Sequence, residues 1–183
     1  MSRNYKFNNP DGTYFVSFAT VEWVDVFTRK DYRDIIIQSL KYCQAEKGLR
    51  VFAYVIMTNH IHLIIKSVGE NTLSEILRDF KKFTSKSMIK AIKENTRESR
   101  RTWMLGIFKK AAEMKVKNKN YQFWRHDNKP IHVYSEKVIR QKLDYIHNNP
   151  VKAGIVLLPK HYLHSSASNY AGLGGLIDVS ILE

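Results

Sequence analysis

Two histidines one residue apart, His60 and His62, are the first residues whose types and spacing could do chemistry. They follow an apolar segment and a Thr58-Asn59 turn, so we expect them to begin a β-strand. Side chains two positions apart on a strand point to the same face, which places both imidazoles together and turns Ile61 to the other side. Two parallel imidazoles suit a divalent metal, although an isolated pair of this kind is more often structural.

Tyr145 is the second residue with chemical potential, on a helix predicted from Glu136 to about Asn148. Its apolar residues Ile139, Leu143 and Ile146 form a core stripe, whereas the polar face carries Gln141, Lys142, Tyr145, Asn148 and Asn149. Most tyrosines are packing residues. Tyr145 differs because Asn149, one helical turn away, could offer its amide oxygen to a metal beside the phenolate.

The histidine pair and the tyrosine would serve one reaction. A tyrosine hydroxyl ordinarily has a pKa of about 10, so its use as a nucleophile requires a nearby cation or base. A metal can also neutralise charge on a phosphate under attack. Two histidines and one amide leave positions for a phosphate oxygen and water on Mg²⁺ or Mn²⁺. The joint presence of both motifs is therefore more specific than either one alone.

The charge of the chain favours a polyanionic partner. Among 183 residues, 30 are Lys or Arg and 17 are Asp or Glu, which gives a formal net charge of +13. Much of it falls between Phe80 and Arg125, where basic residues far outnumber acidic ones. A stripe on one predicted helix there is the candidate DNA-binding surface, and a solvated surface is its alternative: Arg78, Lys82, Lys86, Lys90 and Lys93.

Several protein classes are disfavoured by composition. The single cysteine, Cys43, cannot form an intramolecular disulfide, and no apolar signal-peptide run follows the N-terminus. No segment approaches the roughly 18 continuous apolar residues that a membrane-spanning helix needs. We therefore expect a cytoplasmic globular protein, and a single domain over residues 1–183.

The order of predicted elements defines the fold. A strand over Thr13–Val21 precedes a helix that starts at a capping box, Thr28 to Asp31, and stops at Gly48. A hairpin of two strands, Leu49–Met57 and His60–Lys66, leads to a long helix that a second capping box opens at Thr72. The long helix should bury Leu73, Ile76, Leu77, Phe80, Met88 and Ala91.

The second half of the chain is predicted to complete a ferredoxin-like α+β fold. Residues 95–120 are read as a basic insertion with some helix, and Tyr121–Tyr134 resumes a β-type composition. A last helix begins after Ser135 and should end before Pro150, because proline disfavours helical geometry in the residue before it. The result is a βαββαβ core with an antiparallel sheet and one extra C-terminal helix.

Aromatic and histidine side chains elsewhere are weaker candidates. Phe123 is assigned to the core, and Trp103 and Trp124 could either pack or stack on nucleic-acid bases. The remaining histidines are expected on the surface or in loops: His126, His132, His147, His161 and His164.

The two motifs together resemble a known family. The segment from Val55 to Ile64, which contains Thr-Asn-His-Ile-His, and the segment Asp144 to Gly154 are similar to the single-tyrosine HUH transposases, especially the REP-associated branch. The resemblance covers about Gly12 to Val156. One departure is Thr58, which stands where the family usually has a proline before Asn-His.

This resemblance implies a role for each motif residue. His60 and His62 would be metal ligands around the hydrophobic Ile61, Tyr145 would be the nucleophile, and Asn149 would occupy the place of a third ligand. The implied activity is metal-dependent nicking and strand transfer on single-stranded or hairpin DNA, through a covalent 5′-phosphotyrosine and with Mg²⁺ or Mn²⁺.

Two questions stay open at the level of sequence. A non-catalytic nucleic-acid-binding module is the alternative function, because a basic βαββαβ domain is also the architecture of RNA-recognition domains. That alternative explains neither the histidine pair nor Tyr145. The sequence does not separate a mobile transposase from a domesticated one, or a monomer from a homodimer.

Overall fold

The computed structural model describes residues 7–114, 120–126 and 130–182. Its first half contains β1 (Tyr14–Ala19), the short 3₁₀ helices η1 (Val21–Trp23) and η2 (Val26–Thr28), α1 (Lys30–Lys47), β2 (Leu49–Ile56), β3 (His60–Ser67) and α2 (Leu73–Glu94). Its second half contains α3 (Arg101–Glu113), β4 (Ile131–His132), α4 (Glu136–Lys152), η3 (Pro159–His161) and α5 (Ala167–Tyr170). No helix within these described ranges has the length and apolar character needed to cross a membrane.

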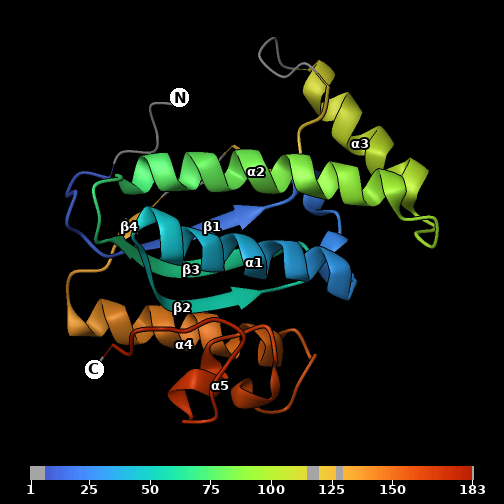
Figure 1. Cartoon of the computed structure of the whole chain (residues 1–183). Helices are drawn as coiled ribbons and strands as arrows, with labels where there is room; N and C mark the ends of the chain where they lie inside the picture. Colours follow the sequence, from blue (N-terminus) through green and yellow to red (C-terminus); the bar gives the residue numbers. More distant parts are fainter. Residues whose placement is uncertain (1–6, 115–119, 127–129, 183) are drawn as a thin grey trace.

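The four strands form one antiparallel sheet in the order β2-β3-β1-β4. This order and the βαββαβ succession of elements confirm the predicted ferredoxin-like fold, and α4 is the predicted extra helix (Figure 1). In the register of β1 with β3, Ser17 lies opposite His62 and Ala19 lies opposite His60. The central position of β3 thus places the histidine pair inside the sheet.

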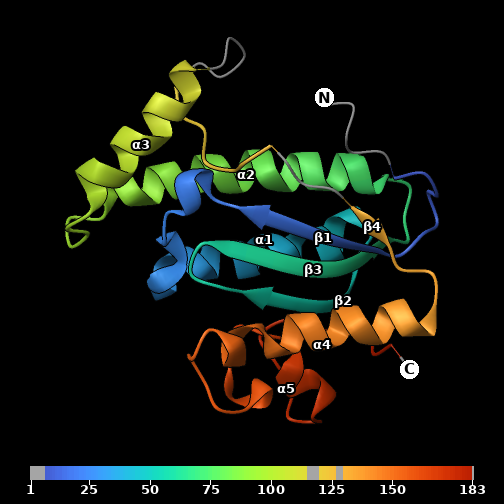
Figure 2. The ribbon, with the colours of Figure 1, turned by 180° about the vertical axis from the view of Figure 1, so that it is seen from behind.

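Each face of the sheet has its own hydrophobic core. One core contains Ile61, Leu63 and Ile65 of β3 together with apolar side chains of α1 and α2. The other contains Phe15 and Ile64, which pack against Ile146 of α4. In both views of the ribbon, α2 and α4 lie on opposite sides of the sheet (Figures 1 and 2). The even positions of β3, which include His60 and His62, therefore belong to the α4 side.

Two predicted helix boundaries are wrong. The capping box at Thr28 does not form, because α1 starts at Lys30 with Arg29 in the N-cap position and no side-chain cap. The Thr28 hydroxyl instead accepts a hydrogen bond from Arg100 Nη2 at 3.1 Å. Helix α4 also runs through Pro150 to Lys152. A proline there costs one helical hydrogen bond close to the helix end, and its ring is buried. The cost is local, so the helix continues.

Other expectations for the helices are confirmed. Gly48 ends α1 with a left-handed backbone (φ 69°), and the Thr72–Glu75 capping box opens α2. The predicted core residues of α2 are buried, apart from Ala91, which is half-buried and packs against the same core.

The expected strand over Tyr121–Tyr134 is mostly irregular. Only Ile131–His132 forms β4, and Trp124 makes one isolated bridge to Thr20; residues 127–129 lie outside the described residues. The β-type composition reflects burial more than strand pairing, since Phe123 and Trp124 are 1% and 4% exposed and the pairing with the end of β1 is limited to this one bridge. The Trp124 indole donates to Thr84 Oγ1 at 2.9 Å. Phe123 is thereby confirmed in the core, and Trp124 joins it, whereas Trp103 is 54% exposed.

The segment after α4 covers the outer edge of the sheet at β2. Backbone hydrogen bonds join Ile56 N to His164 O, Ser166 N to Tyr54 O, and Ser180 N to Val51 O. This packing corrects the expectation for His164, which is buried and not on the surface. His147 of α4 also has a partner there, because its Nε2 lies 2.9 Å from Ser166 Oγ.

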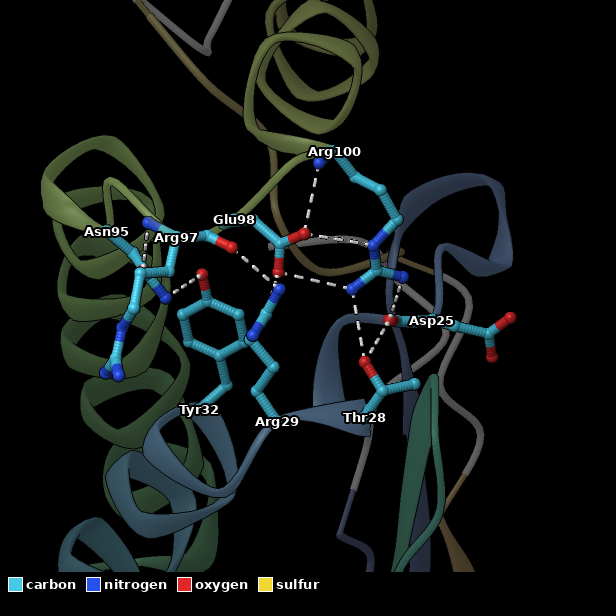
Figure 3. Close-up of polar contacts among 8 residues, drawn as sticks. All are labelled: Asp25, Thr28, Arg29, Tyr32, Asn95, Arg97, Glu98 and Arg100. Carbon is cyan, nitrogen blue, oxygen red and sulfur yellow. Dashed lines mark hydrogen bonds and ion pairs between the residues drawn. The ribbon is translucent and has the colours of Figure 1, made fainter.

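A buried carboxylate ties the predicted insertion, residues 95–120, to the first half of the chain (Figure 3). Glu98 is 3% exposed. Its Oε2 lies 2.6 Å from Arg29 Nε, and its Oε1 accepts from Arg100 Nε and Arg100 N, both at 3.1 Å. Arg100 also donates to the backbone carbonyl of Asp25 at 3.0 Å. The start of α3 is therefore held against the loop before α1, and Met104 and Phe108 of α3 enter the main core.

The Glu98 contacts predict a pH-dependent stability. Burial alone raises the pKa of Glu98, but hydrogen bonds from Arg100 and Arg29 outweigh it and hold the pKa at about 2. Because the folded pKa lies below the unfolded one, the stabilisation is complete above about pH 4.5 and is lost as the pH falls towards 2. We expect Glu98→Gln to reduce the free energy of unfolding at pH 7 by roughly 1–3 kcal/mol, the range for hydrogen bonds to charged groups.

Urea unfolding of both proteins between pH 7 and pH 2.5 measures this effect. The difference between wild type and Glu98→Gln should shrink steadily below about pH 4.5. Glu94→Gln is the matched control, because Glu94 is exposed and its contact with Lys90 is 4.0 Å long. A Glu98→Gln deficit that stays constant across this pH range would show that the carboxylate charge is not the source of the stabilisation.

Candidate active site

The two histidines of β3 lie next to each other beneath α4. The ring centroids of His60 and His62 are 4.7 Å apart, and both side chains point away from Ile61, which is fully buried in the opposite core. Phe15 of the neighbouring strand stacks on His62 with a centroid distance of 5.4 Å. The predicted alternation of side chains along β3 is confirmed, and it places both imidazoles side by side on the face of the sheet that packs against α4.

Tyr145 of α4 reaches the same place from the far end of the chain. Its ring centroid lies 5.0 Å from that of His62 and 5.9 Å from that of Phe15. The side chain is 41% exposed, so one side of the phenol contacts the sheet and the rest is open to a ligand. Helix α4 brings it there because Ile146, the next residue, anchors the helix in the core on this face.

His62 is a buried polar side chain without a partner. It is 5% exposed, and neither Nδ1 nor Nε2 has a hydrogen-bond partner among the described residues. Burial, together with positive charge at His60 and Lys142, lowers the pKa of His62 to about 3. The imidazole is therefore neutral at pH 7 and has a free lone pair, which is the form that binds a metal. Leaving such a group unpaired is costly, so the site fits a divalent cation.

His60 is oriented by its neighbour in the sequence. Its Nδ1 lies 2.7 Å from Asn59 Oδ1, while Asn59 Nδ2 donates to Asp25 Oδ1 and to the Trp23 carbonyl, both at 3.1 Å. The amide oxygen of Asn59 thus faces the ring, and His60 Nδ1 donates to it. Nε2 is left as the acceptor nitrogen. Sequence reasoning assigned Asn59 only to a turn, although a side-chain acceptor beside a metal-binding histidine is a common arrangement.

Asn149 is half-buried on α4, four residues after Tyr145. Of the two adjacent amides, Asn148 donates from Nδ2 to the Asp144 carbonyl at 3.0 Å, and no side-chain hydrogen bond of Asn149 is found in the described part of the chain. Nowhere within those residues do three or more His, Cys, Asp or Glu side chains gather to hold a metal. A third ligand would have to be of another type, and an amide remains our prediction.

Lys142 is a member of the site that sequence reasoning missed. Its Nζ lies 4.9 Å from the ring centroid of Phe15 and 5.9 Å from that of Tyr145. The sequence placed Lys142 on the polar face of the helix but gave no reason to connect it with β1. Only the packing of α4 across the sheet brings this ammonium beside the tyrosine.

Comparison with known proteins identifies the family. The family model described as "Transposase IS200 like" matches residues 12–119, more than half of the chain. The chain belongs to the IS200-like transposase family. The matched residues include His60 and His62 and stop before Tyr145. A search of curated proteins found no match.

One solved structure supports the fold of this IS200-like transposase. A REP-associated tyrosine transposase bound to a REP hairpin aligns with a TM-score of 0.62 and 19% identity, over 100% of this chain and 96% of that one. A candidate transposase from Deinococcus radiodurans R1 aligns with a TM-score of 0.45 and 18% identity, over 81% of this chain and 95% of that one.

The basic stripe of the transposase lies on α2, on the other side of the sheet from Tyr145. All five of its side chains are exposed: Arg78, Lys82, Lys86, Lys90 and Lys93. Arg78 pairs with Asp79 at 3.1 Å, and Lys93 Nζ lies 4.6 Å from the ring centroid of Tyr121. Three of the lysines, Lys86, Lys90 and Lys93, line an open cavity of about 420 Å³ between α2 and Tyr121. The structure therefore separates this surface from the histidine and tyrosine cluster.

Proposed function

We propose that this transposase cuts single-stranded DNA at a hairpin or repeat through a covalent bond between Tyr145 and the 5′ phosphate. The observation that carries the proposal is the contact of Tyr145 with His62, a buried imidazole whose two nitrogens have no partner among the described residues. A nucleophile and an unsatisfied pair of metal-binding side chains meet in one partly open place. Packing alone does not explain an unpaired histidine there.

The proposed reaction needs no external energy source. The Tyr145 oxygen attacks the phosphorus, a bond forms between them, and the bond from phosphorus to the 3′ oxygen breaks. The phenol proton passes to water, which reaches Tyr145 because the side chain is 41% exposed, and the departing 3′ oxygen takes up a proton. Strand transfer is the reverse step, in which a 3′ hydroxyl attacks the phosphotyrosine. The bond energy is kept in the covalent intermediate.

His60, His62 and Asn149 would hold Mg²⁺ or Mn²⁺. When bound, such a cation supplies positive charge to the phosphate under attack. The chain itself contributes the orientation of His60 through Asn59, the neutral state of His62 through burial, and the placement of Tyr145 through α4. Similarity to a transposase bound to a REP hairpin supports hairpin DNA as the substrate class.

The covered faces of the sheet disfavour the alternative function, a non-catalytic nucleic-acid-binding module. RNA-recognition domains bind bases on an open sheet face through exposed aromatic side chains. Here the face opposite α1 and α2 packs against α4, and its aromatic residues Phe15 and Phe52 are 6% and 8% exposed.

A labelled hairpin oligonucleotide tests the proposal. With the label on the 3′ side of the cut and Mn²⁺ present, a denaturing gel should show label that migrates with the 21.5 kDa protein. EDTA, which removes the Mn²⁺, should prevent formation of this protein-bound label. Two free DNA products without any protein-bound label would instead identify a hydrolytic nuclease and overturn the proposal.

The basic stripe predicts salt-dependent DNA binding. Replacing Lys82, Lys86 and Lys90 together by Gln should weaken binding to all DNA sequences and flatten the dependence of affinity on salt, by roughly one unit of slope per lost phosphate contact. Lys41→Gln is the control, since Lys41 is an exposed lysine of α1 outside the stripe. If the triple variant kept the wild-type affinity and salt dependence, the stripe would be a solvated surface that does not contact DNA.

A further inference from the structure

Lys142 is a half-buried cation beside the proposed nucleophile. It lies one turn before Tyr145 on α4, and its ammonium is over the face of Phe15 at 4.9 Å and near the ring of Tyr145 at 5.9 Å. Phe15 in turn stacks on His62. Lys142, Tyr145 and His62 thus surround the same aromatic ring.

The charge of Lys142 has no carboxylate partner in the described part of the chain. Arg140, on the same helix, lies 3.8 Å from Glu136, and exposed Lys30 pairs with Asp34, whereas Lys142 has no acidic group within 4.0 Å among the described residues.

A cation in this position is complementary to an anion next to the phenol. For attack, the phosphorus must come within about 3–3.5 Å of the tyrosine oxygen. A phosphate at that oxygen is then near the Lys142 ammonium, which is 5.9 Å from the ring centroid of the same tyrosine. A fixed cation stabilises the negative charge that the phosphate oxygens carry in the transition state.

We propose that Lys142 binds the non-bridging oxygens of the phosphate that Tyr145 attacks. This inference rests on the proposed function, because it requires a DNA phosphate at Tyr145. It adds a catalytic residue to the histidine pair, the tyrosine and the amide. The competing interpretation is purely structural: an ammonium over Phe15 stabilises the packing of α4 against β1.

A neutral phosphate analogue separates the two interpretations. Binding is measured in the Tyr145→Phe background, which cannot react, with hairpins that carry either a normal phosphodiester or one uncharged methylphosphonate at the cut position. Adding Lys142→Met should lower affinity for the normal hairpin roughly tenfold and should leave affinity for the methylphosphonate hairpin unchanged. An equal loss on both hairpins would show that Lys142 only supports the fold, and the inference would be wrong.

Reaction rates give a second, independent readout. In protein with Tyr145 intact, Lys142→Met should slow single-turnover adduct formation by about 10²-fold, and Lys142→Arg should recover part of the rate because it keeps the charge. Lys137→Met is the matched control, since Lys137 is an exposed lysine of the same helix. Absence of an adduct in the wild type would overturn the proposed function, whereas a wild-type rate in Lys142→Met would overturn this inference alone.

Discussion

Tyr145→Phe should abolish the covalent adduct while it preserves the fold. The substitution removes only the hydroxyl, and the ring contacts with His62 and Phe15 at 5.0 and 5.9 Å are made by carbon atoms that remain. Among the described residues, Tyr145 is the tyrosine whose ring contacts the histidine pair. We therefore expect cleavage to fall below detection, with unchanged thermal unfolding and hairpin affinity.

Peptide mapping of the wild-type adduct decides which tyrosine reacts. The label should lie on a peptide that contains Asp144 to Pro150. Tyr134 is the control residue, because it is 76% exposed and precedes the same helix; Tyr134→Phe should react at the wild-type rate. Label on another tyrosine would keep the enzyme class and overturn the site. Cleavage by Tyr145→Phe at the wild-type rate would overturn the mechanism.

His62→Leu should abolish cutting and at the same time stabilise the metal-free protein. The imidazole is buried with two nitrogens that find no partner in the described residues, so its replacement by an apolar side chain removes a desolvation cost. We expect the free energy of unfolding in EDTA to rise by roughly 1–2 kcal/mol. A residue that lowers stability when the metal is absent is typical of a binding site.

The response to Mn²⁺ completes this test. A ligand that binds the folded state raises the free energy of unfolding, so Mn²⁺ should stabilise the wild type and leave His62→Leu unaffected. His161→Leu is the control, since His161 is exposed in η3, away from the β3 pair. If His62→Leu were stabilised by Mn²⁺ as strongly as the wild type, His62 would not be a ligand.

Local patterns predicted the elements that carry the site. The two-residue period of β3 placed both histidines on one face, and the helical period of α4 separated Ile146 from Tyr145. Both rules depend on backbone geometry that tertiary packing did not change. The order of strands and helices then sufficed for the ferredoxin-like topology, because few arrangements satisfy that order.

Features that depend on distant partners could not be predicted. The Thr28 capping box does not form because α1 starts one residue later than predicted, and the Thr28 hydroxyl accepts from Arg100 instead. The role of Glu98 depends on Arg29, which is far away in the sequence. Lys142 joins Tyr145 only through the contact of α4 with Phe15. Phe123 and Trp124 led to the prediction of a strand because buried positions and paired strands favour the same residue types.

The covered edge of the sheet also limits how two copies of the transposase could associate. An exposed strand edge presents unpaired backbone groups to which another chain can add a strand. At one edge, the segment after α4 occupies the backbone of Val51, Tyr54 and Ile56. At the other, β4 pairs over only two residues. Within the described residues, a homodimer that joins two sheets through their β2 edges is therefore disfavoured.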